Sequence, residues 1–322
     1  MDMLVDIVYI WVDGSVPGFD EKIKSRLCSS AMVKSADQIG IRRFRNNQEL
    51  LYSLRSVHLF APWVRRIHVV TDGLPPSWLN PRHDKIAVVT HQQIFRRERD
   101  LPVFNSNAIE MNLHRIPDLA RKFLYLNDDL FLGRPIGLDD FMTDAGGHIF
   151  YLEPIPIPQN PDGVPVHDRA YYYTRKAVQD QWPDVEISFL PAHCPQLYDR
   201  DHLGRLEQQF QEAFDRTSGH AFREPEDLVL RILYHAFLSS HKGEGKDHRS
   251  RLLAWGSPDY SFITMERKPI AMMHAFNYIV RGRPKFFCIN DDLGDSVGDR
   301  CILKLQRHFL EKMYPEKSCF ER

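Results

Sequence analysis

The sequence has almost no net charge and no long apolar run. Its 42 Lys and Arg face 43 Asp and Glu, for a net charge of -1, so charge balance argues against a general nucleic-acid binder and any phosphate recognition must be local. No apolar stretch approaches the ~20 residues that a membrane-spanning helix needs. The first residues, MDMLVDIVYIWVDG, carry acids where a secretory signal would be basic. We therefore expect a cytoplasmic protein, with peripheral association at the inner face of a membrane left open.

Cysteine motifs and glycine-rich nucleotide motifs are also missing. The five cysteines are an odd number at wide spacing, without a CxxC pair, which favours a reducing compartment over zinc or redox chemistry. Neither GxxxxGK[ST] nor GxGxxG occurs, so there is no P-loop and no dinucleotide fingerprint. A diphosphate would have to be held by a metal ion, arginine side chains and backbone amides.

The first half of the chain alternates short apolar strands with helices. Strands are predicted at 5–12, 66–72, 85–90 and 122–127, because each segment is short, rich in Val, Ile or Tyr, and closed by a polar residue. Helical spacing of apolar residues predicts helices within 46–63 and 106–119. This order implies parallel crossovers, so we predict an α/β fold with a Rossmann-like, mostly parallel sheet.

The second half has mainly helical periodicity. It predicts helices at 167–182, 200–217 and 224–240, followed by a strand at 285–290 and a closing helix at 298–315. The segments LNDDL and INDDL, at 126–130 and 289–293, are near copies. We expect them at comparable edges of the fold.

Polar side chains follow each predicted strand of the first half. Asp13, Asp72 and His91 follow the first three strands, and Asp128 and Asp129 follow the fourth. Parallel strands bring their carboxyl ends to one edge, where ligands of α/β sheets gather. Two adjacent carboxylates there would suit Mg²⁺ or Mn²⁺ bound together with a diphosphate. An ordinary Asn-Asp turn is the alternative explanation of this stretch.

Several long segments resemble the successive blocks of the Stealth family of sugar-1-phosphate transferases. These segments are DIVYIWVDGS at 6–15, RFRNNQELLYSLRSVHLFAPWVRRIHVVTDGLPPSWLN at 43–80, VVTHQQIF, LPVFNSNAIEMNLHRIPDLARKFLYLNDDLFLGRP, PAHCPQLYDR, FDRTSGHAFREPEDL and FFCINDDLGD. The family acts in capsule and exopolysaccharide synthesis and includes the catalytic subunit of a GlcNAc-1-phosphotransferase. The resemblance runs in order along nearly the whole chain.

The resemblance implies a reaction and residue roles. An acceptor-sugar hydroxyl would attack the phosphorus next to the sugar of a UDP-sugar, with UDP-GlcNAc as the common donor, and UMP would leave. Asp128 and Asp129 match the family's acidic pair, for metal and diphosphate, with Asp129 also a candidate base. His193 matches the catalytic histidine and Arg223 the arginine. Taken alone, His193 reads as a structural residue, and Arg223 as a partner of Glu226 or Asp227.

The remaining blocks supply candidates for binding the donor and completing the metal site. Asn290 and Asp292 are predicted to complete the shell of Mg²⁺ or Mn²⁺. Uracil, ribose, phosphate or sugar contacts are predicted for Trp11, Val12, Asp13, Arg43, Arg55, Asn105, Ser106 and Asn107. Packing is the alternative for Trp11, and an ordinary helix cap is the alternative for the Asn-Ser-Asn stretch.

These expectations combine into one predicted catalytic domain over 1–322. It comprises a nucleotide-sugar-binding core at 1–150, similar to a GT-A glycosyltransferase, a helical acceptor-side region at 151–280, and a strand and helix at 281–322 that return to the core. Its partners would be a UDP-sugar and an oligo- or polysaccharide, with no nucleic acid. Two rival functions stay open: a metal-dependent glycosyltransferase that releases UDP, and a nucleotide-sugar-binding protein without turnover.

Overall fold

The computed structural model describes residues 3–28, 34–240, 247–254 and 256–322. Its central sheet has the strand order β3-β2-β1-β4-β8. The four predicted strands of the first half are confirmed as β1 (Val5–Ile10), β2 (Ile67–Thr71), β3 (Ile86–Thr90) and β4 (Lys122–Asn127), and they run parallel. β8 (Gln196–Asp199) closes one edge antiparallel to β4. The predicted α/β class with a mostly parallel sheet is therefore confirmed.

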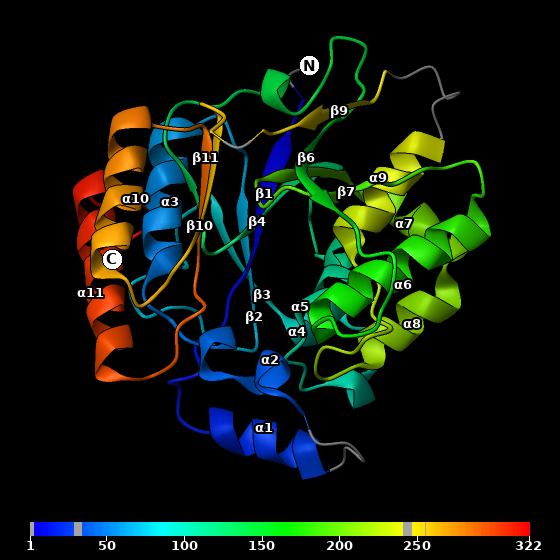
Figure 1. The fold of residues 1–322 in the computed structure, drawn as a ribbon, viewed down its shortest axis with the longest axis horizontal. Coiled ribbons are helices and arrows are strands. Elements are labelled where there is room, and N and C mark those ends of the chain that lie inside the picture. The colour runs from blue at the N-terminus through cyan, green and yellow to red at the C-terminus, as the bar shows by residue number, and fades with distance from the viewer. Residues whose placement is uncertain (1–2, 29–33, 241–246, 255) are drawn as a thin grey trace.

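Helical layers cover the central sheet on both sides (Figure 1). One layer contains α3 (Glu49–Phe60), α10 (Pro269–Gly282) and α11 (Val297–Met313); the other contains α5 (Ser106–Glu110), α6 (Val166–Gln181), α7 (Arg200–Gln209), α8 (Gln211–Gly219) and α9 (Leu230–Ser240). Alternate residues of β1 face opposite layers, since Val8 belongs to one apolar cluster and Ile7 and Tyr9 to the other. Both faces are apolar, as expected for parallel strands between two helical layers.

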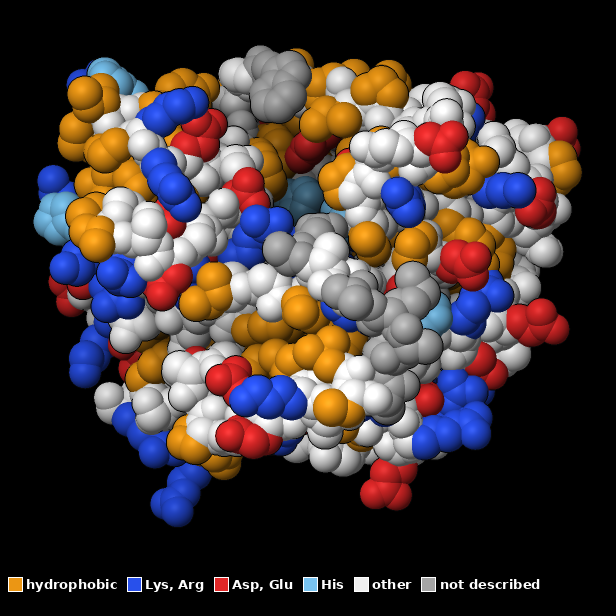
Figure 2. Space-filling model, turned by 60° about the horizontal axis from the view of Figure 1, so that its bottom comes forward, with side chains coloured by type: hydrophobic (Ala, Val, Ile, Leu, Met, Phe, Trp, Pro, Cys, Tyr) orange, Lys and Arg blue, Asp and Glu red, His pale blue; other side chains and the backbone are white. Residues whose placement is uncertain are grey.

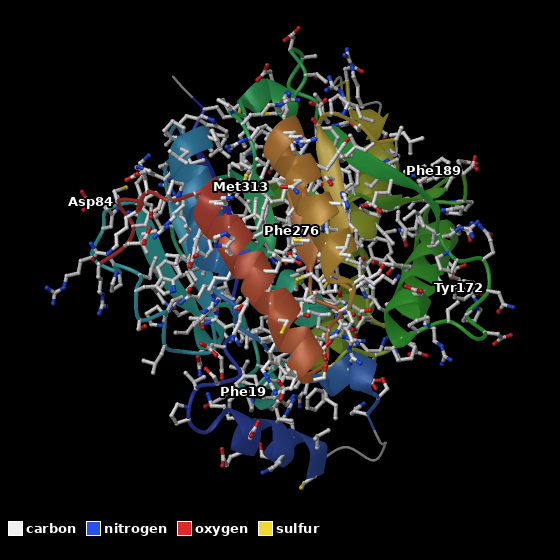
Figure 3. All side chains as sticks on the ribbon, turned by 60° about the vertical axis from the view of Figure 1, so that its left-hand side comes forward. Phe19, Asp84, Tyr172, Phe189, Phe276 and Met313 are labelled. Atoms are coloured by element: carbon white, nitrogen blue, oxygen red, sulfur yellow. The ribbon has the colours of Figure 1, made fainter. Side chains whose placement is uncertain are left out.

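α10 and α11 pack against each other in the layer that Figure 3 brings forward. Phe276 of α10 stacks on Phe309 of α11 with ring centroids 4.6 Å apart. Met313, near the end of α11, belongs to the same buried cluster. This pair covers one face of a second, three-stranded sheet, β10-β11-β5, formed by Tyr260–Thr264, Phe286–Asn290 and Leu130–Leu132. The predicted final strand therefore exists, but it joins this second sheet and not the central one.

The region predicted to be helical also contributes strands. β6 (Ile149–Pro156) pairs with β7 (Phe189–Pro191) and β9 (Arg249–Leu252) in a third sheet, and β8 belongs to the central sheet. The single helix predicted at 200–217 is two helices, α7 and α8, divided at Phe210. The helix predicted from 224 begins only at Leu230. Division of the chain at 150 and 280 stays a prediction.

Short helices lie at the end of the molecule where β1 to β4 finish. α1 (Phe19–Cys28) and α2 (Ala36–Ile39) follow β1, and α4 (His91–Ile94) follows β3 directly. They lie at the bottom of Figure 1. Figure 2 turns that end toward the viewer and shows a face hollowed near its middle, with Lys or Arg and His side chains inside the hollow. The carboxyl ends of parallel strands are where an α/β protein positions its ligands.

Candidate active site

The acidic pair of FLYLNDDLFLG is a two-residue turn between two sheets. β4 ends at Asn127 and β5 begins at Leu130, so Asp128 and Asp129 carry the chain from the central sheet into the second sheet. Ser53 of α3 donates a hydrogen bond to the Leu130 carbonyl, which holds the start of β5. At the other end of β5, a Cβ on Gly133 would lie 2.2 Å from a backbone carbonyl oxygen. The strand that follows the turn is therefore fixed at both of its ends.

The two carboxylates are strongly desolvated. Desolvation raises the pKa of Asp128 well above its usual range, and the negative charges of Asp129 and Glu49 act in the same direction. Desolvation also raises the pKa of Asp129 to about 6, against the hydrogen bond from Cys288 and the charge of Arg231. Asp129 Oδ2 accepts that bond from Cys288 Sγ at 3.4 Å. Its Oδ1 is buried and has no hydrogen-bond partner within the described part of the chain.

The second Asn-Asp-Asp segment lies beside the first. The Ile289 amide donates to the Asp129 carbonyl at 3.1 Å, so the end of β11 adjoins the acidic turn. Asp291 adds a negative charge that raises the pKa of Asp129. Asp291 itself pairs with Arg45 at 3.1 Å. The expectation that the two near copies occupy comparable edges is confirmed, and they form one acidic region.

A buried arginine lies across the end of β4 from the acidic turn. Arg231 of α9 donates to Asn127 Oδ1 at 3.2 Å and to the Ala192 carbonyl at 3.3 Å. Its guanidinium lies over the Tyr125 ring, 5.6 Å from the centroid. Burying a cation requires nearby anions or polar groups, and Glu110 is one of the acids whose charge favours this guanidinium. Arg231 therefore links β4, α9 and the His193 loop.

His193 lies in the loop between β7 and β8, next to Arg231's acceptor Ala192. Its amide is held by the Tyr260 hydroxyl at 3.1 Å, and its ring lies 5.1 Å from the Phe262 ring. Desolvation lowers the pKa of His193 to about 3, and the positive charges of Arg231 and Arg223 act in the same direction. The imidazole is therefore neutral at physiological pH and has a lone pair that can take a proton.

Arg223 is positioned by the start of α5. Its guanidinium donates to Ser106 Oγ at 3.0 Å. Its charge also lowers the pKa of His167, near the start of α6, and so do the charges of Arg43 and His193, although desolvation is the largest cause. His167 Nε2 and the Tyr171 hydroxyl share a hydrogen bond. The Nδ1 atom of His167 is buried without a partner among the described residues. Arg43, Arg223, Arg231 and the two histidines thus form one electropositive group.

The predicted donor-binding residues divide into those at this edge and those with structural roles. Trp11 is buried in the core, which favours the packing alternative. Asp13 accepts from Asn46 Nδ2 at 2.7 Å and from Ser15, which ties the end of β1 to the loop before α3. Val12, beside it, is only partly buried at the same strand end. This segment lies at the carboxyl end of the parallel strands, where α/β sheets generally bind their ligands.

Asn105 and Asn107 are internal structural residues. Asn105 is fully buried, caps α5 by accepting from the Asn107 amide, and donates to Asp227 at 2.8 Å. Asn107 donates to the same carboxylate oxygen at 3.2 Å. The cap alternative therefore explains both side chains. Ser106 differs, because its hydroxyl is the group that contacts Arg223.

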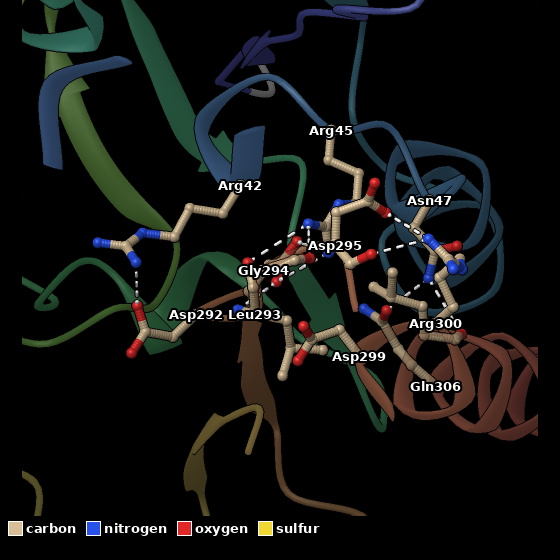
Figure 4. A network of polar contacts seen from close by, with 12 residues as sticks. Arg42, Arg45, Asn47, Asp292, Leu293, Gly294, Asp295, Asp299, Arg300 and Gln306 are labelled. Atoms are coloured by element: carbon tan, nitrogen blue, oxygen red, sulfur yellow. Dashed lines mark hydrogen bonds and ion pairs between the residues drawn. The ribbon is translucent and has the colours of Figure 1, made fainter. Parts of the chain in front are cut away.

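Arg55 and Asp292 have protein partners in this structure. Arg55 points from α3 toward the C-terminal segment, where Glu321 accepts two hydrogen bonds at 2.8 and 2.9 Å and Tyr314 accepts a third at its carbonyl. It does not join the electropositive group because the helix turns it away from the sheet edge. Asp292 is half exposed and pairs with Arg42 at 3.1 Å (Figure 4). Asp291 is an acid of this segment whose charge raises the pKa of Asp129.

Metal ligation was predicted for Asp128, Asp129, Asn290 and Asp292. Among the described residues, no group of three or more His, Cys, Asp and Glu side chains is arranged to hold a metal ion. Asn290 ends β11, and its carbonyl accepts from the Met265 amide. The buried, unpartnered Oδ1 of Asp129 and the adjacent Asp128 are oxygen donors of the type that Mg²⁺ prefers.

Three residues near this site were missed in the sequence analysis: Arg231, His167 and Glu110. Arg231 had a signal, because it is a lone cation in the apolar run LVLRILYHAFL, and a buried charge needs a reason. His167 had none, since a histidine near a helix start is ordinary. Glu110 was equally hidden, and burial raises its pKa while Tyr125 donates to it at 3.0 Å.

Family models match three segments of the chain. They are described as Stealth protein conserved region 2, at residues 43–150, conserved region 3, at 192–240, and conserved region 4, at 277–322. The segments lie in the family's order and together span more than half of the chain. The chain belongs to the Stealth family. Asp128, Asp129, His193, Arg223 and Arg231 all fall within matched regions, whereas His167 does not.

Curated relatives of this Stealth protein include exopolysaccharide phosphotransferase SCO6023 of Streptomyces coelicolor, 34% identical over 99% of this chain and 52% of its own. Exopolysaccharide phosphotransferase CpsY of Mycobacterium leprae is 32% identical over 99% of this chain and 57% of its own. The chain thus spans about half the length of these two relatives. A solved structure, the galactosyltransferase LgtC with donor and acceptor sugar analogs, has a TM-score of 0.42 and 13% identity over 94% of this chain and 95% of its own. That likeness is too weak to carry an inference.

No helix in the described part of the chain is both long enough and apolar enough to cross a membrane. All five cysteines are free thiols. The predicted cytoplasmic location and possible membrane association stay predictions.

Proposed function

We propose that this chain is a phosphotransferase that moves a sugar-1-phosphate from a UDP-sugar, such as UDP-GlcNAc, to a hydroxyl of an acceptor saccharide in capsule or exopolysaccharide synthesis. The observation that carries the proposal is the juxtaposition at one sheet edge of a desolvated acidic turn with an electropositive group that contains a neutral histidine. Family membership and the names of the curated relatives support it.

The reaction moves one phosphoryl group and one proton. The acceptor oxygen forms a bond to the phosphorus that bears the sugar, and the bond from that phosphorus to the bridging oxygen breaks. UMP leaves with the bridging oxygen and its electron pair. The product is a phosphodiester between two sugars, and the hydroxyl proton passes to a base. Negative charge grows on the leaving phosphate, which demands cations held ready before the reaction.

His193 is our candidate for the base. Its lowered pKa keeps the imidazole unprotonated, but a pKa of about 3 would also make it a weak base. The arginines that contribute to this lowering, Arg231 and Arg223, are the groups expected to meet the donor diphosphate. A bound diphosphate would offset their charges and make His193 more basic when substrate is present. Asp129 is the alternative base, because its pKa is raised to about 6.

Arg223 and Arg231 are assigned to the phosphoryl oxygens. Guanidinium groups suit phosphate because they present fixed, parallel donors. Arg223 is held by Ser106, and Arg231 by Asn127 and the Ala192 carbonyl. Neither side chain would have to be reorganised far when the donor binds.

Asp128 and Asp129 are assigned to a divalent cation. Their oxygens fit Mg²⁺ or Mn²⁺, and the donor diphosphate would provide further ligands. A bound cation would neutralise charge on the diphosphate. Binding of Mn²⁺ to the metal-free protein, followed by electron paramagnetic resonance, tests this without turnover: Asp129→Asn should weaken it and Asp292→Asn should not.

The decisive experiment identifies the nucleotide that is released. The protein is incubated with a panel of UDP-sugars, Mg²⁺ and candidate acceptor oligosaccharides, and the nucleotides are separated by chromatography. Attack at phosphorus gives UMP and retains the sugar's anomeric configuration. Acceptor-dependent UDP would show attack at carbon and would overturn the mechanism in favour of an ordinary glycosyltransferase. Binding without either product across the panel would favour the non-enzyme rival.

A further inference from the structure

A cavity of about 300 Å³ lies beside His193. None of the roles assigned above uses it. Its lining includes Glu153, Tyr260, Phe262 and Tyr278. Ligand pockets for small molecules start at roughly this volume and are mostly apolar, with a few polar groups that fix orientation. Aromatic rings and one carboxylate are therefore the features that decide what this cavity binds.

Two walls of the cavity reach His193 directly. Tyr260 places its hydroxyl 3.1 Å from the His193 amide, and Phe262 places its ring 5.1 Å from the imidazole. Phe262 also pairs in register with Cys288 of β11, whose thiol donates to Asp129. A group bound against Phe262 would thus lie close to His193 and beside the strand that carries Cys288 to the acidic turn.

The polar group of the cavity is a buried carboxylate. Glu153 accepts a hydrogen bond from the Tyr260 hydroxyl and one from the His193 amide at 3.3 Å. Within the described residues, both bonds are made by Oε1, so Oε2 is left to accept a hydroxyl of a bound molecule. A carboxylate in this position repels anions, which argues against a phosphate or an acidic sugar in the cavity.

The cavity adjoins a wider hollow of about 620 Å³. Gly256 and Tyr278 line both, and the second hollow continues past Asn277 and Arg281 of α10. Tyr278 is 53% exposed, so its ring is open to a bound molecule at the point where the two hollows meet. The two hollows together form a path that begins at Tyr260 and Phe262, the two neighbours of His193, and extends outward along α10.

We infer that this path binds the acceptor as an extended neutral oligosaccharide. Its reacting unit fills the cavity between Phe262 and Glu153, and its further units lie across Tyr278. The apolar face of a sugar ring packs on an aromatic side chain, while its hydroxyls need acceptors such as Glu153. The inference rests on the proposed function for the identity of the reacting hydroxyl, but the binding site can be tested separately.

The test measures sugar binding without a donor, by saturation-transfer NMR on the full chain. The probes are four neutral tetrasaccharides at millimolar concentration: cellotetraose, maltotetraose, mannotetraose and chitotetraose. At least one should bind the wild type, and its dissociation constant should rise roughly tenfold in Tyr278→Ala and in Glu153→Gln, the scale of losing one packing or hydrogen-bond contact. Tyr278 is exposed, so its variant should fold normally.

Tyr172→Ala is the matched control. Tyr172 lies on α6 in the opposite helical layer (Figure 3), outside the cavity lining. Binding should be unchanged in that variant. Absence of binding by all four probes to the wild type would overturn the inference, and so would equal binding by wild type and Tyr278→Ala.

The same variants separate this inference from the proposed function. With an acceptor that supports UMP release, Tyr278→Ala should raise the acceptor KM and leave the donor KM unchanged. UMP release with an unchanged acceptor KM would contradict the inferred acceptor path and support the proposed function. Sugar binding that depends on Tyr278, without any UMP release, would support the inferred acceptor path and contradict the proposed function.

Discussion

The two Asn-Asp-Asp segments have nearly the same sequence and adjoin each other, yet their carboxylates are balanced in different ways. After β11, Asp291 pairs with Arg45 and Asp292 with Arg42. Desolvation raises the pKa of Asp291 too, but the charges of Arg45 and Arg42 act against that rise. After β4, the pKa values of Asp128 and Asp129 are raised, and one Asp129 oxygen is buried without a partner among the described residues. A carboxylate that pairs with an arginine of the same chain has a structural role. A desolvated carboxylate without such a pair is available to bind a cation from solution.

The arginines that balance the second segment come from the loop before α3. Figure 4 shows Arg45 reaching the backbone of Leu293 and Gly294, and Asn47 joined to Gln306 of α11. This network fastens the segment after β11 to the edge of the central sheet. The comparison predicts that substitutions after β4 impair function and that matched substitutions after β11 have smaller effects.

The largest expected effect is that of Asp129→Asn. It removes a proposed metal-binding charge, and turnover should fall by ~1,000-fold, the upper range for losing one group that stabilises charge in the transition state. The thermal unfolding temperature should not fall, because the substitution removes a desolvated charge. Steady-state kinetics and calorimetry check the two parts. Near-normal activity would show that the acidic pair of FLYLNDDLFLG is an ordinary turn without a role in the reaction.

The next effects are those of His193→Ala and Arg223→Ala. Each should lower turnover by at least ~100-fold, the usual scale for a general base or a charge-stabilising donor. They should differ in binding: donor affinity should fall strongly for Arg223→Ala and little for His193→Ala, as titration calorimetry with UDP-GlcNAc would show. Full activity in either variant would assign that residue a structural role.

A third prediction concerns an acid at the opposite end of β1 whose charge is balanced by groups of the same chain. Asp6 is fully buried; burial opposes its charge, but hydrogen bonds from Arg65, His68 and the Ala120 amide lower its pKa to about 2. A lowered pKa stabilises the fold above the unfolded-state pKa near 4, and this stability is lost as pH falls toward 2. The loss should be ~2 kcal/mol.

Urea unfolding between pH 5 and pH 2 measures this dependence. Asp6→Asn should flatten that part of the curve while lowering stability at pH 7, since Arg65 then lacks its anion. Asp118→Asn is the matched control, because Asp118 contacts the same Arg65 from an exposed position. An equal flattening in the control would contradict the assignment to Asp6.

The smallest effect is expected for Asp292→Asn. The Arg42–Asp292 pair is exposed on the acid's side, and exposed pairs contribute ~0.2–1 kcal/mol. Turnover should change less than about twofold. A loss comparable to that of Asp129→Asn would reverse the comparison and restore Asp292 as a metal ligand.

The sequence was informative where local pattern decides structure. Short apolar segments that are closed by polar residues predicted β1 to β4. The same pattern placed Asp13, His91 and the acidic turn at one edge of the sheet. The sequence was misleading where the direction of a side chain depends on tertiary packing. Arg55 is on the predicted helix, but which face α3 presents to the sheet is set by Tyr9, Ser53 and Leu130, which lie far apart in sequence.

Long-range pairing was equally hidden. Nothing local to KFFCIN distinguishes a strand of the central sheet from one that pairs with LFL at 130–132. The start of α9 was placed too early because EPED resembles a first turn, whereas Asp227 is instead occupied by Asn105, Asn107 and His220. Contacts of this kind depend on the assembled fold.

The hydrogen bond from the Ile289 amide to the Asp129 carbonyl joins positions 160 residues apart in sequence. During synthesis, the ribosome has to add those residues, and then release them from its exit tunnel, before the acidic turn can meet β11. The central sheet can form much earlier, from β1 to β4. A nascent chain would therefore have a formed central sheet before its acidic turn has its final neighbours, so a truncated product ending before β11 would hold the edge proposed for the donor without a finished site.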